Sequence, residues 1–339
     1  MTSVAQTQIQ FQVAEIFQAE IYRVADCQLQ IVADSLEAAD IWREAGNKYY
    51  MTRLEEGQEI DVTGMVEIFC CANSPAIPSD WEMDFIEHGV AFSDGREIWL
   101  AVADSLIIIE HLSAPRLQIW VGKTEFARSA EGLDILLAYA LPSILRCCHR
   151  FEIHAAGLIS PNSDRGILVL GDSGSGKSTL AVRLVQSGWQ YLSDDLMLLK
   201  AAESEVAAWG LRRFFALTDQ TIQFCFATRI ASELQGEKYY VLPEDLWTGA
   251  RATLTKPAAL FFSRLTFDAT SSVERLAPAE AMLQLIRQSP WLCYDPRTAQ
   301  THTEILKQLT EQSPAYQLNA GRDLLLEPDA ANRLLQPYL

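Results

Sequence analysis

The feature that most constrains the fold is a glycine-rich segment in the middle of the chain, residues 171–178, which read Gly-Asp-Ser-Gly-Ser-Gly-Lys-Ser. The apolar run at 167–170 before it is typical of a buried parallel strand. After it, Leu180, Leu184 and Val185 recur at helical spacing. A strand, a G-x-x-x-x-G-K-[ST] loop and a helix in this order predict a phosphate-binding loop.

The residue types in this segment suit the chemistry of phosphate. Glycine lets the backbone turn tightly and bring its N–H groups close to phosphate oxygens, and the helix N-terminus directs its partial positive charge at the same anion. We expect Lys177 to reach the β- and γ-phosphates of a nucleotide and the Ser178 hydroxyl to bind Mg²⁺. A glycine-rich turn without a ligand is the alternative. The predicted nucleotide-binding residues are Gly171, Asp172, Ser173, Gly174, Ser175, Gly176, Lys177, Ser178 and Thr179.

Charge and composition limit the classes of ligand. The formal net charge of −17 argues against a nucleic-acid binder, because the nucleic-acid backbone attracts basic surface. The negative net charge does not exclude a nucleoside triphosphate, since a phosphate loop binds phosphate through its own N–H groups, one lysine and a metal ion. No apolar run approaches the length that spans a membrane, the N-terminal residues do not read as a signal peptide, and the seven cysteines include no C-x-x-C pair. We therefore expect a cytoplasmic protein that binds neither nucleic acid nor membrane.

The chain divides into two parts by sequence pattern. Residues 1–128 are expected to form a β-rich N-terminal domain, mostly antiparallel, because short β-rich runs alternate with turn signals. Residues 129–339 are expected to form an α/β domain around the phosphate loop. Residues 129–148 are helical in pattern, and Pro142 predicts a kink or a break there. The expected strands are 9–13, 66–71, 89–92, 98–102, 106–109, 117–121, 258–265, 315–319 and 323–327, and the later helices are 218–234, 278–288, 301–312 and 328–335.

Two adjacent acids, Asp194 and Asp195, follow the predicted loop helix. The spacing allows a turn at Gly188 and a strand that returns beside the loop strand, which would place both acids at the ligand edge of the sheet. One carboxylate can serve a metal ion, and the other can accept a proton from an attacking hydroxyl. A solvated Asp-Asp turn is the alternative. His154, on the strand before the loop strand, is on its own most typical of a core histidine.

The run from His154 to Asp195 resembles the catalytic domain of the bacterial HPr kinase/phosphorylase family. That family has an H-G-V-L-like strand, a G-x-S-G-x-G-K-S loop and a G-x-x-x-x-x-D-D segment. Here these are His154-Ala-Ala-Gly-Leu, residues 171–178 and Gly188-Trp-Gln-Tyr-Leu-Ser-Asp-Asp. The resemblance implies a fold related to phosphoenolpyruvate carboxykinases, with ATP and Mg²⁺ as ligands.

Residue by residue, the resemblance also implies roles. Lys177 and Ser178 would contact phosphate and Mg²⁺. Asp194 would act as the base toward a serine hydroxyl, and His154 and Asp195 would support it. Asp195 and Ser178 would also bind the metal ion.

The resemblance does not extend along the whole chain. The family's Glu-x-Arg-Gly signature has no glutamate at the nearest place here, residues 207–212, which leaves the reverse phosphorylase reaction and the partner HPr open. The layout is more similar to divergent HPr-kinase-like proteins, among them lasso-peptide precursor kinases, which phosphorylate a serine on a peptide. Arg212, Arg213 and Lys238 are candidates for phosphate contact, with solvated surface charge as the alternative.

The expected function is therefore that of an ATP- and Mg²⁺-dependent kinase that transfers the γ-phosphate to a serine hydroxyl of a small protein or peptide. A small-molecule kinase and a nucleotide-binding regulator without transfer are the alternatives. The sequence leaves open the acceptor, the role of the N-terminal domain and assembly into a homo-oligomer.

Overall fold

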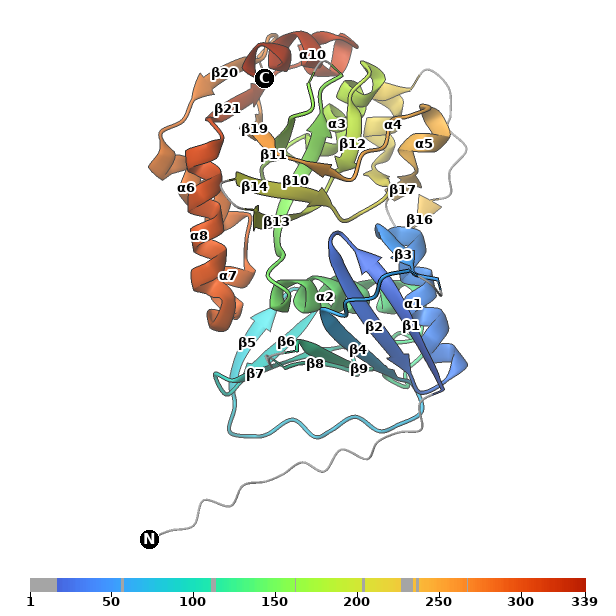
Figure 1. Cartoon of the computed structure of the whole chain (residues 1–339). Coiled ribbons are helices and arrows are strands. Elements are labelled where there is room, and N and C mark those ends of the chain that lie inside the picture. The colour runs from blue at the N-terminus through green and yellow to red at the C-terminus, as the bar shows by residue number, and fades with distance from the viewer. Residues whose placement is uncertain are drawn as a thin grey trace.

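The chain is a mixed α/β protein built on two large sheets, which lie one below the other in Figure 1. The computed structural model describes residues 17–55, 58–110, 114–161, 163–202, 205–226, 234–235, 238–266 and 268–339. The strand predicted at 9–13 lies outside these residues. Among the helices that the model describes, none combines the length and apolar character needed to cross a membrane.

The first sheet comes from the N-terminal part of the chain. Its strands are β1 (Gln18–Val24), β2 (Cys27–Ala33), β3 (Met51–Arg53), β4 (Gly64–Phe69), β5 (Glu82–Ile86), β6 (Gly89–Ser93), β7 (Glu97–Val102), β8 (Ser105–Glu110) and β9 (Arg116–Trp120). Their order is β3-β1-β2-β4-β9-β8-β7-β6-β5, and only β2–β4 and β4–β9 pair in parallel. The strands predicted at 66–71, 89–92, 98–102, 106–109 and 117–121 are confirmed as β4 and β6 to β9.

Two helices, α1 (Leu36–Lys48) and α2 (Ala130–Cys147), cover one face of this sheet (Figure 1). Ser129 caps α2 by accepting a hydrogen bond from the Gly132 N–H. The helix runs unbroken through Pro142, so the predicted break is wrong. Pro142 and its neighbours are buried, and their packing outweighs the one backbone hydrogen bond that proline removes. The division of the chain at residue 128 stays a prediction.

The second sheet carries the predicted phosphate loop. Its strands are β10 (Phe151–Ile159), β11 (Gly166–Leu170), β12 (Gln190–Ser193), β13 (Leu196–Ala202), β14 (Glu205–Gly210), β18 (Leu254–Thr255), β19 (Pro257–Leu265), β20 (Ser272–Arg275) and β21 (Ala315–Ala320). The order is β18-β14-β13-β10-β11-β19-β21-β20, with β12 beside β10. A small third sheet has the order β15 (Phe215–Leu217), β17 (Lys238–Val241), β16 (Leu234–Gln235).

Helices cover both faces of the second sheet. They are α3 (Lys177–Gln186), α4 (Asp219–Cys225), α5 (Pro243–Leu246), α6 (Pro278–Arg287), α7 (Trp291–Tyr294), α8 (Pro296–Gln312), α9 (Asp323–Leu326), α10 (Ala330–Leu335) and a 3-10 turn (Gln336–Tyr338). In β11, Ile167 and Val169 pack with α3 and α10, whereas Leu168 and Leu170 pack with α6 and α8. Because successive strand residues face opposite sides, a fully apolar strand forms the middle layer of three.

Three sequence predictions need correction. The strand predicted at 323–327 is wrong, because residues 323–326 form helix α9, where the Asp323 side chain accepts the Leu324 N–H and starts a helical turn. The helix predicted at 218–234 ends at Cys225, and residues 227–233 lie outside the described part. Strand β12, which leads to the acid pair, lies beside β10 and not beside β11, since β10 is long enough to pair with both β12 and β13. The other later elements are confirmed as β19, β21, α6, α8 and α10.

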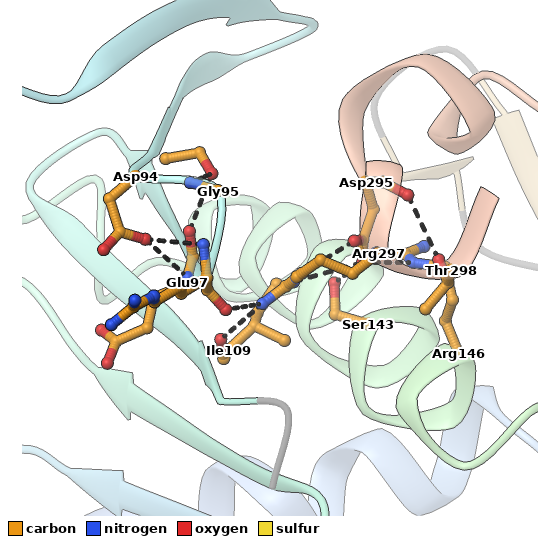
Figure 2. A network of polar contacts seen from close by, with 11 residues as sticks. Asp94, Gly95, Glu97, Ile109, Ser143, Arg146, Asp295, Arg297 and Thr298 are labelled. Atoms are coloured by element: carbon orange, nitrogen blue, oxygen red, sulfur yellow. Dashed lines mark hydrogen bonds and ion pairs between the residues drawn. The ribbon is translucent and has the colours of Figure 1, made fainter.

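A buried polar network joins the two sheets (Figure 2). Arg297 of α8 donates to the main-chain carbonyls of Arg96 and Ile109 in the first sheet, at 2.8 and 3.3 Å. The same guanidinium pairs with Asp295, which also pairs with Arg146 of α2. The C-terminal helices are therefore fixed to the N-terminal sheet by charged side chains with little access to water.

Asp26 provides a second link, and it predicts an acid-sensitive contribution to stability. Its carboxylate pairs with Arg150 at 2.8 Å and Lys200 at 2.7 Å. Burial raises the pKa of Asp26, but the hydrogen bonds from Arg150 and Lys200 outweigh it and lower the pKa from 3.8 to about 2. A lowered pKa in the folded state stabilises the protein above the unfolded-state value, and this stabilisation is lost as the pH falls toward the folded-state value.

We expect Asp26→Asn to lower the free energy of unfolding by about 1 kcal/mol near neutral pH, because the pair is partly exposed and screened. The difference between parent and variant should stay constant from about pH 7 to 5 and shrink toward pH 2. Urea unfolding of both proteins across this range measures it. A difference that does not change with pH would show that the ionised carboxylate is not the stabilising form.

Candidate active site

The predicted phosphate loop connects β11 to α3 through three glycines with positive φ angles. Gly174 and Gly176 have φ of +78° and +89°, which L-residues with a side chain rarely adopt. At Gly171 a Cβ atom would lie 2.5 Å from the Ser263 carbonyl oxygen. Gly176 is the N-cap of α3 and has no side chain to cap it, so the first N–H groups of α3 are available to an anion.

Lys177 folds back over this loop. Its ammonium donates to the carbonyl oxygens of Gly171 at 2.6 Å and Asp172 at 3.1 Å, and the side chain is largely buried. Burial lowers the pKa of Lys177, while Asp195 and Asp172 act in the opposite direction. A phosphate group placed in the loop would give this ammonium a charged partner in place of two neutral carbonyls.

Some of the other loop residues are exposed to solvent, and others are buried beneath the loop. Asp172, Ser173 and Gly174 are exposed at the rim, where a phosphate would enter. Ser175 is buried, and its carbonyl oxygen accepts a hydrogen bond from Ser263 at 2.9 Å. Thr179 differs from the rest, because its hydroxyl lies 3.0 Å from that of Thr221 in α4.

Asp194 lies at the end of β12, buried with 2% of its surface exposed. Its carboxylate accepts a hydrogen bond from the Ala216 N–H at 3.1 Å, and the nearby Ser178 side chain lowers its pKa. Burial raises the pKa of Asp194, and repulsion by Asp195 adds to the rise. This carboxylate therefore faces the loop helix from within the protein and needs a positive neighbour to stay ionised at low cost.

Asp195 faces the opposite way and is partly open to solvent. Its two carboxylate oxygens lie 3.2 Å from Arg212 Nε and 3.6 Å from His154 Nε2. Burial raises the pKa of Asp195, but Arg212 and then His154 outweigh it, so the pKa lies below its usual range. Burial lowers the pKa of His154, and Asp195 raises it in part. Asp195 is thus an ionised acceptor at the solvent side of the loop.

The three basic candidates have different surroundings. Arg212 is the one that contacts the acid pair. Lys238 acts on Asp195, His154 and Lys177 through its charge. Arg213 turns away, because its side chain donates to the Gly46 carbonyl at 3.3 Å.

Two residues of the site were missed by the sequence reasoning. The Tyr191 hydroxyl lies 3.1 Å from Asp194 Oδ1 and accepts the Asp194 N–H at 3.0 Å, which fixes the carboxylate. Gln288, after α6, donates to Asp172 Oδ1 at 3.2 Å and accepts the His154 N–H at 3.0 Å through its main-chain carbonyl. Tyr191 stands on the strand just before the acids, which is a weak signal, and nothing in the sequence marks Gln288.

The site offers few ligands for a metal ion. Within the described residues, no group of three or more His, Cys, Asp or Glu side chains gathers around one point. Ser178 and Asp194 together supply a hydroxyl and a carboxylate oxygen. This pair fits Mg²⁺, which in nucleotide sites takes one or two protein oxygens and completes its shell with phosphate oxygens and water. It does not fit a closed transition-metal site.

Comparisons with known proteins leave the chain without an assigned family. No protein-family model and no curated protein matches the sequence. Among solved structures, the chain is similar to the Hpr(Ser) kinase/phosphatase from Coxiella burnetii, with 14% identity and a TM-score of 0.26 over 44% of this chain and 96% of that one. A likeness of this size does not identify an activity, so function has to come from the site itself.

Proposed function

We propose that the protein is an ATP- and Mg²⁺-dependent kinase that transfers the γ-phosphoryl group to a serine hydroxyl of a peptide or small protein. One observation carries the proposal: two adjacent carboxylates beside the glycine loop have opposite surroundings. Asp194 is buried against Ser178, and Asp195 is open to solvent beside Arg212 and His154. Phosphoryl transfer needs this division, with one acid for the metal ion and one for the acceptor.

The loop residues bind and orient the nucleotide. The N–H groups of the loop and of the first turn of α3 hold the β- and γ-phosphate oxygens, and Lys177 moves from its loop carbonyls to the phosphates. Ser178 and Asp194 hold Mg²⁺, which neutralises charge on the phosphates when it is bound. Gln288 keeps Asp172 and the backbone of His154 in place at the edge of the loop.

Asp195 receives the proton of the acceptor. As the hydroxyl oxygen forms its bond to the γ-phosphorus, the bond from phosphorus to the β–γ bridging oxygen breaks and ADP leaves with the electron pair. The hydroxyl proton passes to Asp195, which Arg212 and His154 hold in position. These roles are the reverse of those implied by the family resemblance, where Asp194 is the base, because the Asp194 oxygens already have partners inside the protein.

The test is transfer from γ-labelled ATP, with Mg²⁺, to serine peptides, to candidate small proteins and to free serine. Asp195→Asn should lower transfer about 10²–10⁴-fold and leave ATP binding close to that of the parent. Asp194→Asn should instead weaken Mg²⁺-dependent ATP binding. Asp245→Asn, at an exposed position on α5, is the matched control and should change neither quantity.

Each contrary outcome has a distinct meaning. Full transfer by Asp195→Asn would refute the role of this base. Label on free serine but on no peptide would indicate a small-molecule kinase. Tight ATP binding without transfer to any acceptor would indicate a nucleotide-binding regulator.

A further inference from the structure

A cavity of about 650 Å³ lies between the two sheets, next to the acid pair. The first sheet and the helices on it contribute α1, α2 and the β5–β6 turn, and the segments beside the second sheet contribute Arg212, Phe214, Tyr240 and Leu242. A volume of this size is typical of sites that hold a small molecule or a few residues of a peptide, about 300–1,000 Å³. None of the loop residues 171–179 is among the residues that line it.

Arg212 connects this cavity to the proposed chemistry. It lines the cavity, and its Nε lies 3.2 Å from Asp195. Residue 212 also forms a backbone bridge to Tyr49 at the end of α1, so the N-terminal part meets the site here. Arg212 therefore links the cavity to Asp195.

The lining of the cavity selects by charge. Three carboxylates, Glu44, Glu87 and Asp134, face two cations, Lys48 and Arg212. Both cations are engaged, Lys48 by Asp134 and Arg212 by Asp195. Glu44 and Glu87 are exposed, and neither pairs with Lys48 or Arg212. Glu44 accepts a hydrogen bond from Asn47 at 3.3 Å, and Glu87 lies 3.7 Å from His88. The mouth therefore carries negative charge that neither cation neutralises.

The wall of the cavity is aromatic, with Tyr49, Tyr139, Phe214 and Tyr240. Aromatic faces bind the methylene stem of a lysine or arginine by burial and its head by cation–π attraction. The whole chain has a net charge of −17, which favours approach of a cationic partner. An acidic mouth over an aromatic wall matches a basic side chain.

We propose that this cavity is the acceptor site, and that it binds a peptide segment with lysine or arginine next to the serine. This inference rests on the proposed kinase function and adds the class of acceptor. Glu44 and Glu87 bind the basic side chain at the mouth, while the serine reaches past Arg212 to Asp195. The first sheet and its helices α1 and α2 thus supply most of the residues that line the acceptor site.

The test measures binding and does not require turnover. The probes are a short fluorescent peptide with one serine between lysines, and the same peptide with every lysine acetylated, each titrated in the presence of Mg²⁺ and a non-hydrolysable ATP analogue. We expect the lysine peptide to bind about tenfold more tightly to the parent protein. In E44Q/E87Q the preference should fall to about twofold or less.

The matched control separates the cavity from general attraction to an acidic protein. Glu304→Gln with Glu311→Gln removes the same charge from the outer surface of α8 and should keep the preference. Equal loss in both double variants, or no preference in the parent, would overturn the proposal. A preference that depends on Glu44 and Glu87 without any phosphoryl transfer would keep the site and refute the kinase. Phosphoryl transfer without a preference for the lysine peptide would support the kinase function and refute the acceptor site.

Discussion

Replacing Lys177 by alanine is expected to lower phosphoryl transfer by about a thousandfold or more while the fold stays intact. The ammonium is the single side-chain cation inside the predicted phosphate loop, and its present partners are the carbonyls of Gly171 and Asp172. In the transition state it would neutralise charge that develops on the transferred group, and interactions of this kind contribute about 10²–10⁵-fold to rate. Label transfer from γ-labelled ATP to the best serine peptide measures the loss.

A fold control belongs to this experiment. The thermal midpoint of Lys177→Ala should lie within about 4 °C of the parent, because the variant loses only two hydrogen bonds, both to carbonyls of the loop itself. Lys307→Ala removes a lysine of the same type from the outer surface of α8, where its side chain is 73% exposed, and should leave transfer unchanged. If Lys177→Ala transfers phosphate as fast as the parent, the loop does not bind the nucleotide.

The second large effect is expected on stability, from Arg146→Ala. Arg146 is fully buried on α2 and pairs with Asp295 at 3.4 Å (Figure 2). It also pairs with Glu152 and lies 4.3 Å from the centre of the Trp291 ring. Arg297 still pairs with Asp295 in the variant, but Glu152 would lose its partner. Burial already raises the pKa of Glu152. Removing one partner of a buried ion pair costs about 3–5 kcal/mol, and urea unfolding should show this loss.

Two further variants test this explanation. Arg287→Ala, at an exposed position on α6, is the matched control and should change the free energy of unfolding by less than about 0.5 kcal/mol. Adding Glu152→Gln to Arg146→Ala removes the stranded charge and should restore part of the loss. If the double variant is no more stable than Arg146→Ala alone, the cost comes from the cavity and not from the unpaired acid.

The parts of the fold with a strong local signal were predictable from sequence. The order of β11, loop and α3 is confirmed because glycine spacing and apolar periodicity both act within a few residues. The amphipathic helices α6 and α8 and the apolar strand β19 are confirmed for the same reason. In contrast, the partner of β12 depends on how far β10 extends, which is a non-local property, and Pro142 is tolerated because of packing by distant strands.

The candidate site shows the same limit. The glycine spacing and the following acid pair were enough to select its candidate residues from the sequence, and their roles stay predictions. Which acid faces Ser178 and which faces Arg212 depends on where β12 ends and on the Tyr191 hydroxyl, and a sequence pattern specifies neither. Gln288 lies far along the chain from the residues it contacts, so only the fold reveals it. The roles of all these residues stay predictions until the variants are measured.

Helix α2 has a consequence for how such a protein can change over evolutionary time. Its apolar face belongs to the core of the first sheet, while its Arg146 pairs with Glu152 of the second sheet and Asp295 beside α8. Recombination that separates α2 from the first sheet would expose the apolar face of the helix and part of the core of that sheet. Recombination that separates α2 from the second sheet would leave Glu152 without Arg146. We therefore expect the two parts to be inherited as one unit.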